Sequence, residues 1–545
     1  MMKRQITIIL FAVLLLLGSV TAASGTVNFP PKDTSITITS TNLPIVWIEV
    51  DGDSIMRDQR ITARMRIIHN GDGQLNYADT VAHPGQRIDY EGYIALRYRG
   101  NTSFTNSPKK PFSFHTMNAP LEVDTCKKQK EKILGMGKDN KWALLAPYAD
   151  KSMIRDLLAF ELARPWMEYV PQGRLCELYL DGIYYGVYVL TEVVSKGKHR
   201  LNLPDPGVEG DSITGGYIME VGTNEGFYHK SKYYPMNSNS GGVYRDKAIY
   251  FQYDWPDYED MSQEQIDYID GAIDQMEAAF ASSKYKDPEV GYRKYIDVQN
   301  FIDYQLAEEL AHNVDGYRLS GKFFKRRDSE DSRFKMVLWD LNLAYGNARH
   351  LQGWRNDKWM YNNNPYMYMS SEQFMVPFWW YKLNKDDNYK AEVVARWAQY
   401  RESNVSEARV MATIDSLTHL ITAHGALERN TQAWPTWGEW VWPNYYVSTD
   451  FNDEIRYIKE WLVERIAWMD SKLGYVPPEP PEPQILVGDA NNDGQLTIAD
   501  LNVIIDIILS GAMPVGDDFK RCDVNADGEI SIADVTSLID MLLKI

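Results

Sequence analysis

The stretch GDANNDGQLTIAD (488–500) is followed by a near repeat of itself, CDVNADGEISIAD (522–534). In each copy, Asp or Asn occupies positions 1, 3, 5 and 12 of a loop that begins at the second quoted residue, and glycine occupies position 6. Oxygen-bearing side chains at this spacing can surround one hard cation, and the glycine permits the sharp turn between them. Two copies in the same register indicate a metal-binding module rather than two solvated acidic loops.

The predicted ion is Ca²⁺, one in each loop, because hard oxygen donors in this number and spacing suit it. The predicted side-chain ligands are Asp489, Asn491, Asp493 and Asp500 in the first loop, and Asp523, Asn525, Asp527 and Asp534 in the second. Gln495 and Glu529 are expected to contribute backbone carbonyls, while Gly494 and Gly528 make the turns.

An apolar helix is expected after each loop, at 501–511 and 535–545, but no entering helix is apparent and the loops end in Asp rather than Glu. This duplicated arrangement resembles a type I dockerin over 487–545, the module that docks enzymes onto cohesins of a cellulosome-like scaffold. The resemblance implies that positions 10 and 11 of each loop face the cohesin. Those residues are Ile498, Ala499, Ile532 and Ala533. Many dockerins carry hydroxyl residues there, so a different partner specificity is expected.

A proline-rich spacer, GYVPPEPPEPQ (474–484), precedes this module. Such a segment favours extended polyproline conformation and holds two domains apart. With the linker taken as 474–486, the chain divides into a main body at 26–475 and the tail module. A length of 545 residues likewise requires more than one domain.

The beginning of the chain predicts a secretory signal peptide at 1–23, because Lys3 and Arg4 precede an apolar run and small residues follow it. The run is shorter than a membrane span needs. A formal net charge of −18 argues against nucleic acid or an anionic membrane as partner. Three cysteines permit at most one disulfide: Cys126 and Cys176 form a pair, or all three are reduced.

The main body shows two kinds of pattern. Residues 26–120 alternate as strands and turns, and CELYLDGIYYGVYVLTEVV (176–194) predicts a hairpin around Asp181-Gly182. Helical spacing is expected from 141 to 166, at 262–281, at 297–312 and over most of 387–473, with a strand at 334–341. The aromatic residues of the loop 434–443 either pack the loop or form a sugar platform. The predicted class is α+β, with a β-rich N-terminal part, a helical C-terminal part and a small all-α tail.

Several stretches of the main body resemble the CotH family of kinase-like proteins. They are LRYRGNTSFTNSPKKPFSFHT (96–116), KWALLAPYADKSMIRDLLAFELA (141–163), LYLDGIYYGVYVLTE (178–192), GGYIMEV (215–221), NVDGYRLSGKFFKRRD (313–328) and FKMVLWDLNLAYGNA (334–348). The resemblance covers a core at 43–400, with a helical extension at 400–475. It implies an atypical protein-kinase-like fold, with ATP and Mg²⁺ chemistry in the active members.

Phosphoryl transfer needs cations on the phosphates, oxygen ligands for Mg²⁺ and a carboxylate that orients the acceptor hydroxyl. Asp315 follows a predicted helix and suits the orienting carboxylate, while Asp340 ends an apolar strand and suits a Mg²⁺ ligand. Arg99 and Lys110 could approach the phosphates, or could be surface charges on an edge strand.

Two positions depart from the family pattern. Ser320 stands where kinase catalytic loops carry Asn, and Asn342 stands where active CotH proteins have the second Asp of a WDxD motif. Both are neutral oxygen donors, so each removes charge that Mg²⁺ prefers.

Three functions therefore compete. The first is an exported kinase acting on Ser or Thr of surface or scaffold proteins, and the second is a non-catalytic component of a cohesin-bound assembly. The third is a glycoside hydrolase, which needs two carboxylates facing each other across a cleft. Glu192 and Glu220 are available for that role.

Overall fold

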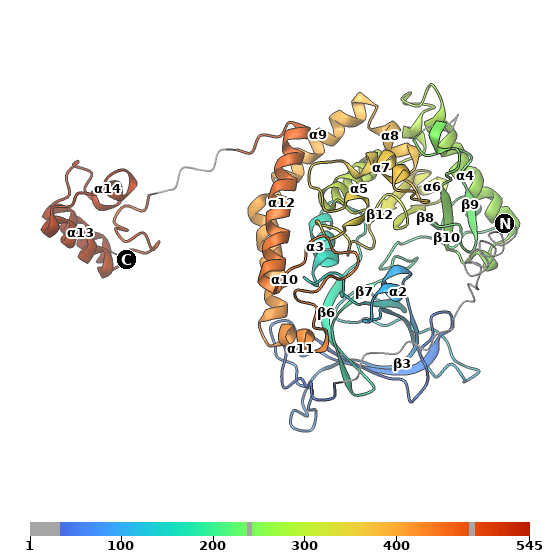
Figure 1. Ribbon diagram of the computed structural model, residues 1–545, viewed down its shortest axis with the longest axis horizontal. Helices are drawn as coiled ribbons and strands as arrows, with labels where there is room; N and C mark the ends of the chain where they lie inside the picture. The colour runs from blue at the N-terminus through green and yellow to red at the C-terminus, as the bar shows by residue number, and fades with distance from the viewer. Residues whose placement is uncertain (1–32, 237–241, 479–484, 545) are drawn as a thin grey trace, which may run out of the picture. The chain divides into compact units, whose positions relative to one another are not determined.

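The computed structural model describes residues 33–236, 242–478 and 485–544. The chain divides between Tyr475 and Val476 into two compact units, the main body and the tail, which are described separately (Figure 1). The predicted signal peptide and linker residues 479–484 lie outside the described residues. Among the described helices, none is both long enough and apolar enough to cross a membrane.

Seven strands at the N-terminal end of the main body close into a barrel in the order β1-β2-β3-β4-β5-β7-β6. They are β1 (Ile45–Glu49), β2 (Ile61–Ile68), β3 (Ile88–Tyr98), β4 (Phe112–Met117), β5 (Lys141–Leu145), β6 (Gly173–Leu180) and β7 (Ile183–Glu192). All neighbours are antiparallel except β1 and β6, whose parallel pairing closes the barrel. Phe112, Trp142 and Tyr188 fill its interior.

The predicted hairpin is present between β6 and β7. Asp181 and Gly182 both have positive φ, 49° and 75°, as a two-residue type I′ turn requires. The prediction of helix from residue 141 is wrong at its start, because Lys141–Leu145 is a strand paired with β4 and β7. Helix begins only at Arg155. Trp142 and Leu144 face the barrel core, and a short apolar run of this kind fits a buried strand as well as a helix.

A second, antiparallel sheet has the strand order β12-β11-β8-β10-β9. Its strands are β8 (Tyr217–Gly222), β9 (Tyr228–Lys230), β10 (Tyr250–Trp255), β11 (Gly321–Lys325) and β12 (Phe334–Val337). β12 ends four residues before the predicted boundary at 341, so Asp340 lies in the loop after the strand. Met219, Phe251 and Phe323 of this sheet share one core with the surrounding helices.

Helices form the rest of the main body and lie above and beside the barrel in Figure 1. They are α2 (Thr102–Asn106), α3 (Arg155–Ala163), α4 (Gln263–Ala281), α5 (Val298–Ala311), α6 (Asp328–Asp331), α7 (Asn364–Met369), α8 (Phe378–Leu383), α9 (Asp387–Arg401), α10 (Glu407–Thr422), α11 (Ala426–Ala433) and α12 (Phe451–Leu473). The predicted α+β composition, with β-rich and helical parts, is confirmed. The closed barrel does not by itself establish a kinase-like arrangement.

Buried ion pairs attach α12 to the elements around the candidate site. Arg465 on α12 contacts Glu309 on α5 at 3.0 Å, and neither side chain is exposed. Arg155 on α3 contacts Asp150 at 2.6 Å and Glu454 of α12 at 2.7 Å. Removing one partner of such a pair leaves an uncompensated buried charge, so these contacts fix the relative positions of α3, α5 and α12.

The tail unit contains α13 (Ile498–Ser510), α14 (Asp517–Cys522) and α15 (Ile532–Leu542). Ile504 of α13 and Leu538 of α15 are fully buried in a small apolar core. The expectation that no helix enters either loop is wrong for the second loop, because α14 leads into it. Phe519 packs against the core and Cys522 is buried within it, and these contacts stabilise this short helix.

All three cysteines are free thiols. Cys176 is buried in the barrel, where its Sγ lies 3.6 Å from the carbonyl oxygen of Tyr188. Cys126 is half-buried, with its Sγ 3.1 Å from the Ala119 carbonyl oxygen. The structure therefore favours the reduced alternative over a Cys126–Cys176 pair.

Candidate functional site

The loops after α5 and β12 bring Asp315 and Asp340 to the same site. Asn313, which is fully buried, joins them: its Oδ1 accepts the Asp315 N–H at 3.3 Å, and its Nδ2 donates to the Asp340 carbonyl at 3.3 Å. Arg318 donates to Asp315 Oδ1 at 2.7 Å, which fixes the orientation of that carboxylate. Asp315 Oδ2 forms no hydrogen bond within the described part of the chain.

Asp340 combines solvent access with a low-dielectric setting. The residue is exposed and has a positive φ of 61°. Desolvation by the surrounding protein nevertheless raises the pKa of its carboxyl, and the Arg99 guanidinium opposes that shift. An acid that is open on one side and surrounded on the others is suited to hold a cation.

Arg99 provides the positive charge beside Asp340. Its guanidinium lies 4.9 Å from the centroid of the Trp339 ring, as in a cation–π contact. Nη1 is buried and forms no hydrogen bond with any described residue. Burial lowers the pKa of this guanidinium, and Asp340 acts against that effect. A buried donor without a partner requires an explanation, and an anionic ligand bound here would supply one.

Asp156, on α3, was not singled out from the sequence. Its Oδ1 accepts the N–H of Leu341 at 2.7 Å, which positions the backbone immediately after Asp340. Burial, with a further contribution from Asp340, raises the pKa of Asp156 to about 8. In the sequence it is an ordinary acidic residue in the first turn of a helix, so no local signal distinguishes it.

Lys322 on β11 was also missed. It lies opposite Glu220 of β8 in the sheet register. Its Nζ donates to Glu220 Oε2 and to Asp254 Oδ2, both at 2.8 Å. Burial alone would lower the pKa of Lys322, but Asp254 and Glu220 outweigh it and raise the pKa. The charge of Lys322 lowers the pKa of the Asp340 carboxyl, and Asp340 raises the pKa of Glu220, so the three groups lie within electrostatic reach of one another.

Ser320 and Asn342 lie in the segments next to the two aspartates. The Ser320 N–H donates to the Asp315 carbonyl at 3.2 Å, directly before β11. The Asn342 carbonyl accepts from Asn347 Nδ2 at 2.8 Å. Neither the Ser320 hydroxyl nor the side-chain carboxamide of Asn342 forms a hydrogen bond with another described residue. Their proposed role as neutral Mg²⁺ ligands stays a prediction.

Lys110 is placed differently from the other candidates. Its Nζ contacts the backbone oxygen of Phe104 and lies 4.8 Å from the centroid of that ring. The preceding Lys109 is buried, donating to the Val187 carbonyl at 2.6 Å and to Asn430 Oδ1 at 3.0 Å. Within the described residues, no contact joins Lys110 to the group around Asp340.

The carboxylate pair considered for glycoside hydrolysis does not form. Glu192 is fully buried at the end of β7, where it makes an ion pair with Arg200 and accepts a hydrogen bond from Tyr169 at 3.1 Å. Glu220 is instead bound to Lys322. A retaining or inverting mechanism needs both carboxylates open to one cleft. Glu192 cannot supply that, because its contacts lie within the protein core.

The two tail loops have matching internal geometry. Asp489 accepts the N–H groups of Asp493 at 3.0 Å and Gly494 at 2.9 Å, and Asp523 accepts those of Asp527 and Gly528, both at 3.0 Å. The position-12 carboxylates are fully buried and turned inward: Asp500 accepts the Thr497 N–H and Asp534 accepts the Ser531 N–H, each at 2.8 Å. Gly494 and Gly528 have φ of 83° and 85°, which accounts for glycine at the turn.

The tail loops can bind Ca²⁺ only if carboxylates, side-chain carboxamides and backbone carbonyls act together as ligands. Within the described residues, no three Asp, Glu, His or Cys side chains converge as a metal site made of such groups alone would require. Asn491 and Asn525 interact with Asp493 and Asp527, and the backbone N–H groups of Gln495 and Glu529 donate to those same aspartates at 2.9 Å. Carboxamide and carbonyl oxygens are ordinary Ca²⁺ ligands, so the donor set suits the ion.

The predicted cohesin-facing residues lie on two equivalent surfaces. Ile498 and Ile532 begin α13 and α15, and each is 71% exposed. Ala499 and Ala533 are exposed beside them. Apolar side chains exposed in the same way at duplicated positions suit a binding surface better than a folding role.

Comparison with family models identifies both parts of the chain. The model described as CotH kinase protein matches residues 96–469, which is more than half of the chain. The model described as dockerin type I domain, a calcium-binding module, matches residues 487–543. A comparison with curated proteins gives no significant match. Both resemblances noted in the sequence are thus confirmed, and the chain belongs to the CotH kinase protein family and carries a type I dockerin domain.

Proposed function

We propose that the main body binds ATP with Mg²⁺ and transfers a phosphoryl group to a Ser or Thr hydroxyl, and that the dockerin attaches it to a cohesin-bearing scaffold. The observation that carries this proposal is Arg99, whose Nη1 is buried without a partner next to the solvent-open carboxylate of Asp340. A cation with a free donor and an accessible metal-ligating oxygen are what a nucleotide's phosphates and their metal require together.

The roles follow from the positions of the side chains. Asp340 would hold Mg²⁺, with Asn342 and Ser320 as neutral donors nearby, and Arg99 would contact phosphate oxygens. Bound Mg²⁺ supplies neutralisation of the developing negative charge on the phosphoryl oxygens. Asp315, oriented by Arg318, has Oδ2 available to accept the proton of the acceptor hydroxyl.

A second candidate is a binding component without transferase activity. Ser320 and Asn342 favour it, because both replace residues that active relatives use at the metal. With only Asp340 charged among these ligands, Mg²⁺ would be held less tightly. Nucleotide binding without transfer to any hydroxyl acceptor would support this candidate over the kinase.

Export is part of the proposal. The sequence at 1–23 predicts a secretory signal, and a dockerin requires a cohesin outside the producing cell to attach to. Positions 498, 499, 532 and 533 are the proposed cohesin contacts. The main body would then act on proteins of the scaffold or of the cell surface.

The test is calorimetric titration of ATP into the full chain with and without Mg²⁺. Wild-type protein should bind ATP in a Mg²⁺-dependent way, and Arg99→Gln should weaken binding by about tenfold, as expected for one lost charge-assisted contact. Arg87→Gln is the matched control, because Arg87 is an exposed arginine paired with Asp89. No heat of binding with wild-type protein, or equal loss in both variants, would contradict the proposal.

A further inference from the structure

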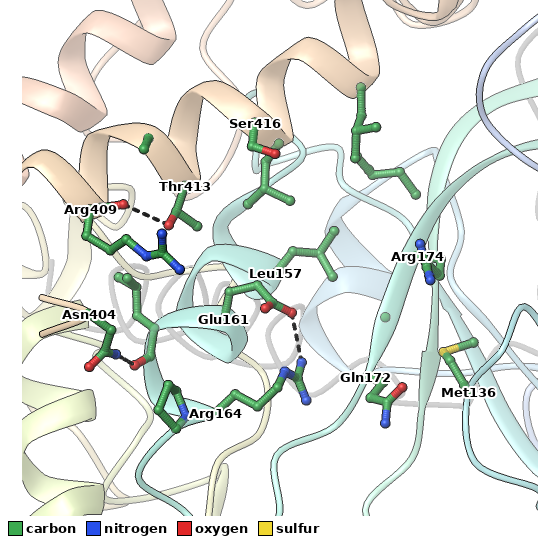
Figure 2. Close-up of a pocket in the computed structure, with 17 residues that line it drawn as sticks. Met136, Leu157, Glu161, Arg164, Gln172, Arg174, Asn404, Arg409, Thr413 and Ser416 are labelled. Carbon is green, nitrogen blue, oxygen red and sulfur yellow. Dashed lines mark hydrogen bonds and ion pairs between the residues drawn. The ribbon is translucent and has the colours of Figure 1, made fainter. Parts of the chain in front are cut away.

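An open cavity of about 960 Å³ lies between α3, α10 and the beginning of β6, and it is lined by residues other than those around Asp340 (Figure 2). On α10, Arg409, Thr413, Ser416 and Leu420 recur at helical spacing and form one wall. The proposed function gives this cavity no role.

The charge of the lining is positive, in a chain whose formal net charge is −18. Arg164, Arg174 and Arg409 contribute three guanidinium groups, and Glu161 is the one carboxylate among the lining residues. Arg164 pairs with Glu161 at 3.0 Å, and Arg174 pairs at 3.1 Å with Asp72, which lies outside the lining. Figure 2 shows Arg409 and Arg174 on opposite sides, with the Glu161–Arg164 pair between them. The Arg409 guanidinium forms no ion pair or hydrogen bond with any described residue. An anionic ligand would therefore meet at least one unpaired cation.

The floor of the cavity is apolar and contains buried Leu157, Leu162 and Leu175. No aromatic side chain is present in the described lining, and so the cavity lacks the flat rings on which sugars stack. The ligand is therefore expected to carry both carboxylates and aliphatic groups.

The backbone of β6 favours an extended ligand. β7 pairs with β6 from Gly173 onward, but β1 meets β6 only from Glu177. Within the described residues, no strand pairs with Gly173–Cys176 on the β1 side, at the point where Gly173 and Arg174 line the cavity. An unpaired strand edge can accept main-chain hydrogen bonds from an added strand, while alternate side chains enter pockets.

We infer that this cavity is a docking site for an acidic peptide segment that binds in extended conformation. Its aliphatic side chains would enter the floor at Leu157 and Leu175. Its carboxylates would pair with Arg409 and would compete with the exposed Asp72 for Arg174. This inference is independent of nucleotide chemistry, because none of the lining residues is among those placed around Asp340. The cavity would let the main body bind a protein partner at a place separate from the site of phosphoryl transfer.

The test uses fluorescence anisotropy of the full chain with a labelled decapeptide of alternating Glu and Leu, which presents the two side-chain types on opposite faces of a strand. Arg409→Glu should weaken binding at least tenfold, since one charge-assisted contact is lost and a repulsion is added. Glu161→Gln should strengthen binding by roughly threefold, because it removes the lining carboxylate and leaves the charge of Arg164 without an acidic partner.

Lys390→Glu is the matched control: it reverses an exposed charge on α9, which does not line the cavity, and should leave affinity unchanged. Thermal unfolding should be the same for wild type, Arg409→Glu and Lys390→Glu. The inference is overturned if the Glu-Leu peptide does not bind, if a Lys-Leu peptide binds equally well, or if Lys390→Glu weakens binding as much as Arg409→Glu. Binding of polygalacturonate in place of the peptide would assign the cavity to an acidic polysaccharide instead.

Discussion

The carboxylates of the tail loops and those of the main body are held in opposite ways. Asp489 and Asp523 accept backbone N–H groups from their own loops and are arranged to meet a divalent cation. In the main body, burial raises the pKa of Asp156 to about 8 and that of Glu277 to about 7, so the neutral form is favoured. We therefore expect the tail to depend on its ion for stability, and the main body to be stabilised by its own packing.

The two kinds of site also differ in how well the local sequence predicts them. Each calcium loop takes all its ligands from twelve consecutive residues, so spacing alone describes the site. The group around Asp340 is assembled from α3, β8, β11 and the loops after β3, α5 and β12, and it depends on tertiary contacts.

The largest effect is expected from removal of calcium. Excess chelator should unfold the tail, because the inward-facing aspartates repel one another without the ion, while the unfolding temperature of the main body stays unchanged. Circular dichroism and calorimetry of the full chain measure both transitions. Asp489→Ala together with Asp523→Ala should reproduce the effect without chelator. A tail that keeps its helical signal in chelator would refute the calcium assignment.

Cohesin docking tests the equivalence of the two tail surfaces. Replacing Ile498 and Ala499 alone should weaken binding to a type I cohesin only slightly, because Ile532 and Ala533 present the same exposed face. Replacing all four should abolish binding. Surface plasmon resonance against a panel of cohesins, with calcium present, measures the affinities. Complete loss from the first pair alone would show that the second surface does not substitute for it.

In the main body, Asp340→Ala and Asp315→Ala should impair different functions, the first nucleotide binding and the second phosphoryl transfer. Loss of Asp340 should remove Mg²⁺-dependent nucleotide binding, because the one charged metal ligand is gone. Loss of Asp315 should leave binding nearly intact and reduce phosphoryl transfer by ~10²–10⁴-fold, the contribution of a positioned acid–base group. Calorimetry and transfer of labelled γ-phosphate to a Ser-bearing acceptor distinguish the two. If both variants lose the same function, the separate roles are wrong.

A smaller effect is expected from Glu277, whose Oε2 accepts from Ser231 Oγ at 2.6 Å and whose Oε1 accepts from Trp379 Nε1 at 2.9 Å. Burial raises its pKa from 4.5 to about 7, so the unfolded chain releases this proton at lower pH than the folded chain does. Its contribution to stability is therefore fully present below pH 4.5 and is lost as the pH rises to about 7, by on the order of 3 kcal/mol.

Glu277→Gln isolates that contribution. The free energy of unfolding of the variant relative to wild type should increase as the pH rises from 4.5 to 7, and then level off. Glu407→Gln, at the exposed start of α10, should show no such trend. Denaturant unfolding of the main-body transition at several pH values provides the measurement. A difference that is flat with pH would show that Glu277 is ionised in the folded protein.

The sequence predicted the main features of the tail and the composition of the main body, but not how the site is assembled. Asp315 and Asp340 lie in recognisable motifs, and the structure brings them together through Asn313. Asp156 could not be distinguished from any helical acid, and Lys322 acquires its partners only through the register of β11 against β8. The strand at Lys141–Leu145 was missed because pairing with β4 and β7 overrides its helical spacing. In α14, apolar packing outweighs the weak intrinsic stability of a six-residue helix.

The most direct measurement of the central claim compares Mg²⁺-dependent ATP binding by wild-type protein and by Ser320→Asn/Asn342→Asp. If Ser320 and Asn342 lie at the metal, restoring the family's ligands should raise the affinity for Mg²⁺, because Asp adds a charge and Asn a better-placed oxygen. Wild-type protein should show detectable binding, and the double variant should bind more tightly. No binding by either protein would contradict the kinase assignment and leave a calcium-dependent, cohesin-attached binding protein.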